Sequence, residues 1–168
     1  MMNPLARMAR IRVDENGSMA IETAFVAPVL LVMALGGFEA SSMVARQTEM
    51  QSAAAEAAAV VRAVAPETAS DRATVRDIVA TSLCGKTQPV VTDGQATCGS
   101  VTVNVDPVYR CGTATAYVTA AGTCGSAAEY QFIKIDLTDT YSPIWAEWGV
   151  GSAVTYDVNR TVQVGLFS

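Results

Sequence analysis

Hydrophobic residues are distributed unevenly along the chain, and the densest run lies near its beginning. Residues 23–38 contain no charged side chain, and extending the run back to Met19 adds only one, Glu22. A segment of this length is about long enough to cross a bilayer as a helix. We therefore predict a membrane-spanning helix over residues 19–38. Pro28 lies inside the run, and we expect a kink there because proline removes a backbone hydrogen bond.

Two other interpretations of this apolar run compete with a membrane helix. A cleaved secretory signal has a shorter apolar core, and the acids Asp14, Glu15 and Glu22 are unusual next to one. A buried helix of a soluble protein can also contain so short a run. Three arginines precede the run and few basic residues follow it, which predicts a cytoplasmic N-terminus and an exported remainder. Length and flanking charge favour a retained membrane helix.

After the apolar run the pattern becomes one-sided. Residues 39–65 contain no glycine or proline and are rich in alanine, glutamine and glutamate. Apolar residues recur there at spacings of three, four and seven, which indicates an amphipathic helix. The predicted buried positions are Met43, Met50, Ala54, Ala57, Ala58, Val61 and Val64. Pro66 is expected to end the helix, so a single helix is predicted over residues 18–65.

The remaining residues, 66–168, predict a small α+β domain. Ser70 as N-cap and Asp71 as a first-turn acid predict a short helix. Its predicted buried residues are Val75, Ile78, Val79 and Leu83. Apolar and polar residues then alternate at 101–105, 133–137 and 162–166, with a fourth candidate segment at 154–158. We expect three or four strands of an antiparallel sheet, with the amphipathic helix covering its apolar face.

Composition and charge exclude several classes of function. The formal net charge is −5 and the chain has no basic cluster beyond its first residues, so a nucleic-acid partner is not expected. There is no histidine, which excludes catalytic triads of the Ser-His-Asp or Cys-His kind. Asp136 and Asp139 could serve a membrane-tethered enzyme, but at this spacing they equally suit a strand end and turn. No catalytic residue, metal or cofactor is predicted.

All four cysteines, Cys84, Cys98, Cys111 and Cys124, follow the predicted membrane helix. They form no CxxC pair, which argues against a zinc or thioredoxin-type site. An even number in a small domain favours two disulfides in an oxidising compartment, and four reduced cysteines are the alternative. We favour Cys84–Cys98 and Cys111–Cys124, which close two short loops, although four cysteines allow three pairings.

The N-terminal third of the chain resembles type IV pilin-like proteins, and more closely the TadE-like minor pseudopilins of tight-adherence (Flp) pili. Members of this family have a leader that ends in glycine, a glutamate as fifth mature residue, a proline-containing apolar stretch, a Gly-x-x-Glu and an alanine-rich helix. The residues that carry the resemblance are Gly17–Glu22, Ala24–Leu31, Gly36–Glu39 and Ala45–Ala63. It is weaker beyond residue 65, where Tyr141–Trp145 and a closing strand are similar and a loop over about 107–126 is an addition.

The resemblance implies a cytoplasmic leader, residues 1–17, that a prepilin peptidase removes by cutting between Gly17 and Ser18. It implies that Glu22 meets the new N-terminal amine of a neighbouring pilin or pseudopilin during assembly. An intramembrane acid is usually functional, but an unpartnered Glu22 capping the helix N-terminus is the alternative. Pro28 and Glu39 are further candidates for assembly or processing, although Glu39 could simply mark the water interface. Thr23 replaces the aromatic residue of major pilins, which favours a minor member.

The leading hypothesis is therefore a noncatalytic minor pseudopilin of the tight-adherence machinery. It would be held in the bacterial inner membrane, or incorporated in the pilus, with residues 66–168 in the periplasm or outside the cell. One alternative is an adhesin or surface-binding module at the filament tip, favoured by the extra loop. Another is an uncleaved membrane scaffold protein of pilus assembly.

Overall fold

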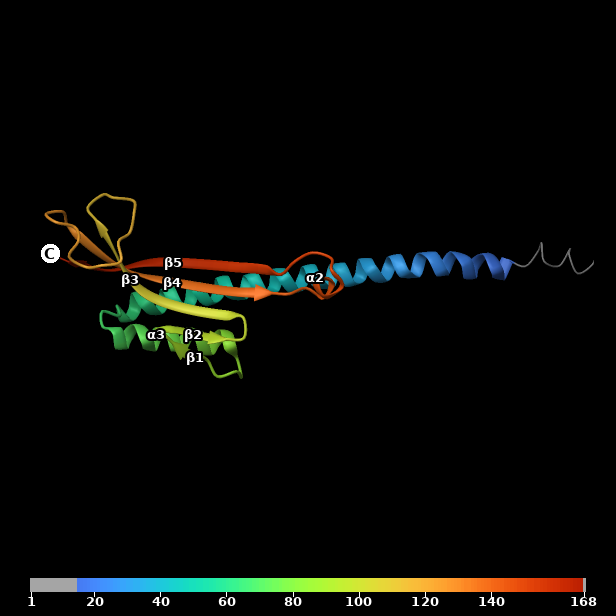
Figure 1. Ribbon diagram of the computed structural model, residues 1–168, viewed down its shortest axis with the longest axis horizontal. Helices are drawn as coiled ribbons and strands as arrows, with labels where there is room; N and C mark the ends of the chain where they lie inside the picture. The colour runs from blue at the N-terminus through green and yellow to red at the C-terminus, as the bar shows by residue number, and fades with distance from the viewer. Residues whose placement is uncertain (1–14, 168) are drawn as a thin grey trace, which may run out of the picture. The chain divides into compact units, whose positions relative to one another are not determined.

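The computed structural model describes the backbone of residues 15–167, with side chains for residues 19–147 and 149–165. The chain divides into two compact units, one ending at Ser42 and the other beginning at Met43. The elements are α2 (Glu15–Val64), α3 (Ala69–Cys84), β1 (Val90–Thr92), β2 (Gln95–Cys98), β3 (Val101–Cys111), β4 (Glu129–Tyr141), the 3₁₀ helix η1 (Ile144–Trp148) and β5 (Val154–Phe167) (Figure 1). The predicted α+β class is confirmed.

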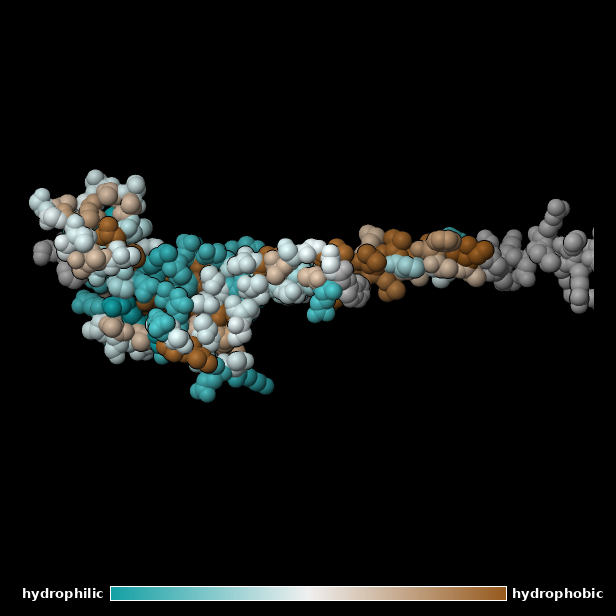
Figure 2. All heavy atoms as spheres, viewed as in Figure 1, coloured by the Kyte–Doolittle hydropathy of each residue, from teal (hydrophilic) through white to brown (hydrophobic). Residues whose placement is uncertain are grey.

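In the first unit, α2 presents apolar side chains on all sides. The large hydrophobic residues exposed here are Met19, Ile21, Phe25, Val26, Val29, Leu30, Leu31, Val32, Met33, Leu35 and Phe38 (Figure 2). The hydroxyls of Thr23 and Ser41 donate to the carbonyls of Met19 and Gly37, so these polar groups are satisfied within the helix. By length and composition the helix is suited to cross a membrane. Such all-round hydrophobicity is typical of a helix surrounded by lipid or by other chains.

The helix is continuous through Pro28, and helical assignment also continues through Gly36 and Gly37. Neighbouring hydrogen bonds maintain a membrane-type helix across a missing proline N–H. The expected kink at Pro28 stays a prediction. The helix ends one residue earlier than predicted, at Val64, where Ala65 takes a left-handed φ of 46° and donates to the Val61 carbonyl.

In the second unit, the remainder of α2 contributes one buried stripe to the core. Met50, Ala54, Ala57, Ala58 and Val61 are buried as predicted, and Ala53 joins them. Of the two remaining predicted positions, the prediction for Val64 is wrong and Met43 is only partly buried. Val64 is 59% exposed because it lies in the last turn, and Met43 is only half-buried. The alanines are small, and Met50 and Val61 are the large fully buried side chains of this stripe.

Helix α3 begins earlier than the sequence analysis predicted. Its N-cap is Thr68, whose hydroxyl accepts from the Asp71 amide while the Asp71 carboxylate accepts from the Thr68 amide. The prediction of Ser70 as N-cap is wrong, because this reciprocal capping box satisfies two free amides and Ser70 falls within the first turn. Val75, Val79 and Leu83 are buried as predicted, whereas Ile78 is 52% exposed and the prediction for it is wrong.

The sheet has five antiparallel strands in the order β1-β2-β3-β4-β5, rather than three or four. The fourth candidate segment, 154–158, is the first part of β5. The sequence analysis missed the hairpin of β1 and β2, whose two-residue turn is Asp93-Gly94. Both turn residues have positive φ, 50° and 81°, as a tight hairpin of this type requires.

Strand β3 extends to Cys111, so the loop predicted from about Pro107 begins five residues later, at Gly112. Pro107 is accommodated because β2 pairs with β3 only at residues 101–103, and the proline faces an unpaired edge on that side. Alternate residues of β3 and β4 face the helices. These include Val103, Ile133, Ile135 and Leu137, each fully buried in one core cluster with α2 and α3.

Candidate functional site

The predicted cleavage position lies in the first turns of α2. The backbone of Gly17 and Ser18 is helical, and the side chains there are not described. Residues 1–14 of the predicted leader lie outside the described residues. Ser18 and Glu22 are four positions apart, so in an α-helix they share one face and are separated by about 6 Å along the axis.

Glu22 is exposed on α2 and is surrounded by apolar neighbours. A shallow hollow on the helix surface is lined by Met19, Thr23, Val26, Ala27 and Leu30 together with Glu22. In the described helix Glu22 lies seven residues after the start at Glu15, beyond the first turn in which the helix dipole favours negative charge. An isolated carboxylate in this setting can accept a cationic partner from another chain, which would satisfy it in an apolar environment.

Glu39 has a different environment from Glu22. Its side chain is 2% exposed and it has an interaction partner. Buried carboxylates need hydrogen bonds or charge partners to offset their desolvation. The role of Glu39 in assembly or at the water interface stays a prediction. Along α2 the two acids are separated by about 25 Å at 1.5 Å per residue. The structure does not bring Glu22, Pro28 and Glu39 together in one site, and Pro28 is exposed.

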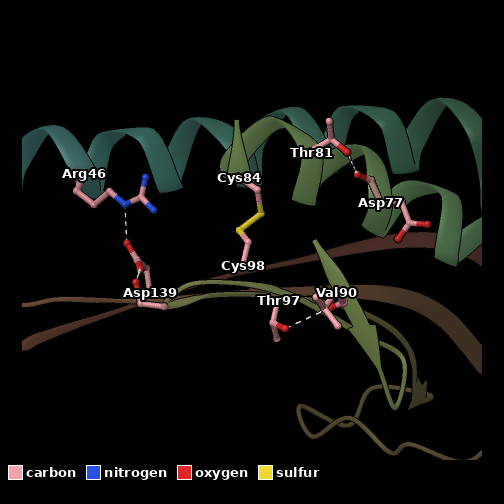
Figure 3. Close-up of a disulfide and its surroundings, with 9 residues drawn as sticks. Arg46, Asp77, Thr81, Cys84, Val90, Thr97, Cys98 and Asp139 are labelled. Carbon is pink, nitrogen blue, oxygen red and sulfur yellow. Dashed lines mark hydrogen bonds and ion pairs between the residues drawn. A yellow bond between two sulfur atoms is a disulfide. The ribbon is translucent and has the colours of Figure 1, made fainter. Parts of the chain in front are cut away.

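The structure forms the two disulfides that the sequence analysis favoured, Cys84–Cys98 and Cys111–Cys124. The first joins the end of α3 to the end of β2 (Figure 3), and both of its cysteines pack against the core. The second closes the loop between β3 and β4. No free cysteine remains, so the thiols offer no catalytic nucleophile.

An ion-pair network that sequence reasoning missed connects α2 to the sheet. The Arg46 guanidinium donates through Nε to Asp139 Oδ2 at 2.5 Å (Figure 3). It also donates through Nη1 to Glu49 at 2.7 Å. The Ser100 hydroxyl donates to the other oxygen, Asp139 Oδ1, at 2.7 Å. Asp139 is 3% exposed. With both carboxylate oxygens engaged, Asp139 supports the fold and is not placed to act as a general base.

Burial and pairing act in opposite directions on these charges. Burial disfavours the ionised form of Asp139, but hydrogen bonds from Ser100 and Arg46 and the charge of Arg46 together hold the pKa of Asp139 below its ordinary value. For Arg46, burial is again opposed by hydrogen bonds to Asp139 and Glu49, and the pKa is raised. The other acid considered for catalysis, Asp136, pairs with Lys134 at 2.9 Å.

The described residues show no cluster of metal-binding side chains. Among residues 19–147 and 149–165, no three cysteine, aspartate or glutamate side chains lie close enough together to hold a metal ion. What the geometry provides is an apolar helix with one exposed acid near its start, followed by a disulfide-bonded α+β domain. Both features suit docking between chains.

Comparison with known proteins bears on the helix. Residues 17–59 match the family model described as TadE-like protein. The matched segment begins at Gly17 and includes Glu22, Pro28 and Glu39, so the predicted resemblance is confirmed over the part of α2 that carries it. No curated protein and no solved structure matches the chain. The match covers roughly a quarter of the chain and ends within α2.

Proposed function

We propose that this chain is a minor pseudopilin of a tight-adherence pilus, anchored through α2 and carrying its disulfide-bonded domain outside the cytoplasm. The observation that carries the proposal is the TadE-like match over 17–59 together with an exposed Glu22 on an otherwise apolar helical surface. The protein acts by assembling with other pilins and pseudopilins. It performs no chemistry of its own.

Assembly begins with leader removal. A prepilin peptidase cuts between Gly17 and Ser18, which frees the Ser18 amine at the start of the apolar helix. The amine and Glu22 then have opposite charges at nearly the same depth, about one helical turn apart along α2. When two such helices pack, the amine of one chain can reach the Glu22 carboxylate of the next. This pairing sets register and partner choice more than raw affinity.

A processing variant and a docking variant test the proposal together. Gly17→Leu places a bulky side chain at the cleavage position, so we expect the leader to be retained and piliation to fall. Glu22→Gln removes the charge at nearly constant volume, so we expect normal leader removal but reduced copurification with other pilins. Intact mass spectrometry and filament counts by electron microscopy are the measurements.

Ala69→Leu is the matched control, because Ala69 is exposed at the start of α3, outside the predicted leader and the apolar part of α2. It should leave both processing and piliation unchanged. The proposal is wrong if Gly17→Leu leaves mature mass and piliation at wild-type values. An unprocessed wild-type chain that still supports piliation would instead favour an uncleaved membrane scaffold.

A second candidate function is an adhesin at the filament tip. One observation favours it: the loop closed by Cys111–Cys124 adds no residue to the main core cluster, yet it is tied to the sheet at several points. A well-ordered surface loop that the core does not need is a common place for recognition. Its removal should then spare piliation and abolish attachment to surfaces, whereas loss of both would assign the loop to assembly.

A further inference from the structure

Arginine and aromatic residues gather on the face of the sheet that is opposite the helices. Arg110 on β3 pairs in register with Tyr130 on β4, and Phe132 lies two residues further on the same face. Tyr117, from the loop between these strands, packs edge-on against Phe132 with ring centroids 5.3 Å apart. We call Arg110, Tyr117, Tyr130 and Phe132 the outer-face cluster. Core residues such as Ile133 face the other way.

Arg110 lies against two rings and has no anionic partner among the described residues. Its guanidinium carbon lies 5.0 Å from the centroid of Phe132 and 5.7 Å from that of Tyr130. Its Nε atom is buried and has no hydrogen-bond partner among the described residues, although the residue as a whole is only half-buried. Buried donors are normally paired, and an exception calls for an explanation. By contrast, Arg46 and Arg76 each pair with a carboxylate.

The loop that carries Tyr117 is held in place beside Arg110. Next to Tyr117, the backbone of Val118 exchanges two hydrogen bonds of 2.8 Å with Tyr109 of β3. The Gly122 amide donates to the buried carboxylate of Glu129 at 2.9 Å, and the Cys111–Cys124 disulfide closes the base of the loop. Tyr117 is nevertheless 44% exposed. An exposed ring on a fixed loop loses little conformational freedom when it binds.

We infer that the outer-face cluster binds a carboxylate-bearing sugar. The Arg110 guanidinium holds the carboxylate, because its planar array of donors matches that group. The exposed Tyr117 ring packs against the C–H groups of the pyranose, as a flat apolar surface with a polar tip can. An acidic peptide fits less well, because Val118 already occupies the edge of β3 where an extended strand would add.

The test measures sugar binding by the full chain in nanodiscs of neutral lipid. The probes are a galacturonate oligosaccharide and sialyllactose, which separate two sources of the same chemistry, with a neutral glucose oligosaccharide and poly-glutamate as comparisons. We expect binding of at least one acidic sugar and none of the neutral one. Arg110→Gln should weaken binding about tenfold or more, and Tyr117→Ala several-fold.

Lys134→Gln is the matched control. Lys134 lies on the same face of β4 and its removal changes net charge equally, but its ammonium already pairs with Asp136. It should change binding less than twofold. Retention of both disulfides and of the near-UV circular dichroism spectrum shows that a variant is folded. Arg110→Lys keeps the charge without the planar donor array, and it should also bind weakly.

Three results would overturn the inference: neither acidic sugar binds, Lys134→Gln weakens binding as much as Arg110→Gln, or poly-glutamate binds as tightly as the sugars. The inference does not depend on the proposed role in assembly. Sugar binding is measured on unassembled protein. A failure to bind sugar therefore does not affect the proposed role in assembly, and a failure of the processing or piliation tests does not affect the sugar-binding inference.

Discussion

Three carboxylates along this chain have different surroundings, and these surroundings decide what each can contact. Glu22 is exposed among apolar side chains, Glu39 is 2% exposed with a partner, and Asp139 is 3% exposed between Arg46 and Ser100. Glu22 remains available to a second chain, whereas Asp139 is committed within its own domain. Residue type alone does not distinguish an assembly contact from a structural one.

The Asp139 network predicts a pH-dependent contribution to stability. Asp139→Asn leaves Arg46 without its buried counter-charge, so we expect the free energy of unfolding at pH 7 to fall by about 3 kcal/mol. Because the folded pKa of Asp139 is lowered, the ionised pair contributes above the unfolded pKa of about 3.9 and is lost as pH falls through the folded value.

Urea unfolding of the full chain in detergent, followed by near-UV circular dichroism, measures this effect. The difference between wild type and Asp139→Asn should be largest near neutral pH and shrink in acid. Asp136→Asn is the control, since its partner Lys134 is 43% exposed and such pairs contribute little. Equal losses in the two variants at pH 7 would contradict this account of Asp139.

At the scale of elements, strong periodicity made α2 and the three long strands predictable from sequence. The buried stripe through Met50 and Val61 and the alternation at 133–137 were both confirmed. Burial of one face gives a regular spacing of apolar residues, which can be recognised in the sequence. The favoured disulfides were also found, since they join cysteines close in sequence. The Asp93-Gly94 turn follows apolar residues and precedes a short strand, which is a hairpin signal in the sequence. This hairpin was not among the predicted elements.

Other features depended on contacts that sequence does not display. Nothing in the local pattern pairs Arg46 with Asp139, which are brought together only when α2 packs on the sheet. The N-cap is an exception, because Thr68 and Asp71 have the spacing of a capping box, which the sequence does display. The exposure of Ile78 followed from the exact angular position of α3 on the sheet. The surroundings of the Arg110 guanidinium could not be predicted, because they depend on the position of the loop between β3 and β4.

The end of α2 offers a test of local strain. Ala65 has a φ of 46°, a conformation that favours glycine because a Cβ crowds the following carbonyl. Ala65→Gly should therefore stabilise the second unit by about 0.5–1 kcal/mol in urea unfolding. Ala59→Gly, at an exposed position inside α2, should instead destabilise it by about 1 kcal/mol. Destabilisation by both substitutions would show that Ala65 is unstrained.

The two disulfides should differ in their contributions to stability. They close loops of nearly equal sequence separation, 14 and 13 residues, so chain entropy alone assigns each about 3 kcal/mol. Only Cys84–Cys98 packs against the core. We therefore expect Cys84→Ala/Cys98→Ala to cost more unfolding free energy than Cys111→Ala/Cys124→Ala under identical conditions. Equal losses would mean that loop closure, and not packing, dominates.

At the scale of the whole molecule, the account combines an apolar helix, which suits a membrane, with an oxidised domain, which suits the space beyond it. Disulfides persist in oxidising compartments, so the two cysteine pairs and the apolar run at 19–38 point to the same orientation. The TadE-like match over 17–59 adds the expectation of leader removal. The central claim is therefore a processed, exported pseudopilin.

Intact mass spectrometry of the wild-type protein, purified from its native membrane, tests this claim most directly. The account predicts a mass that lacks residues 1–17 and carries four fewer hydrogens than the reduced chain, as two disulfides require. A mass that includes the arginine-containing leader, or four cysteines that react with a thiol reagent before reduction, would contradict it.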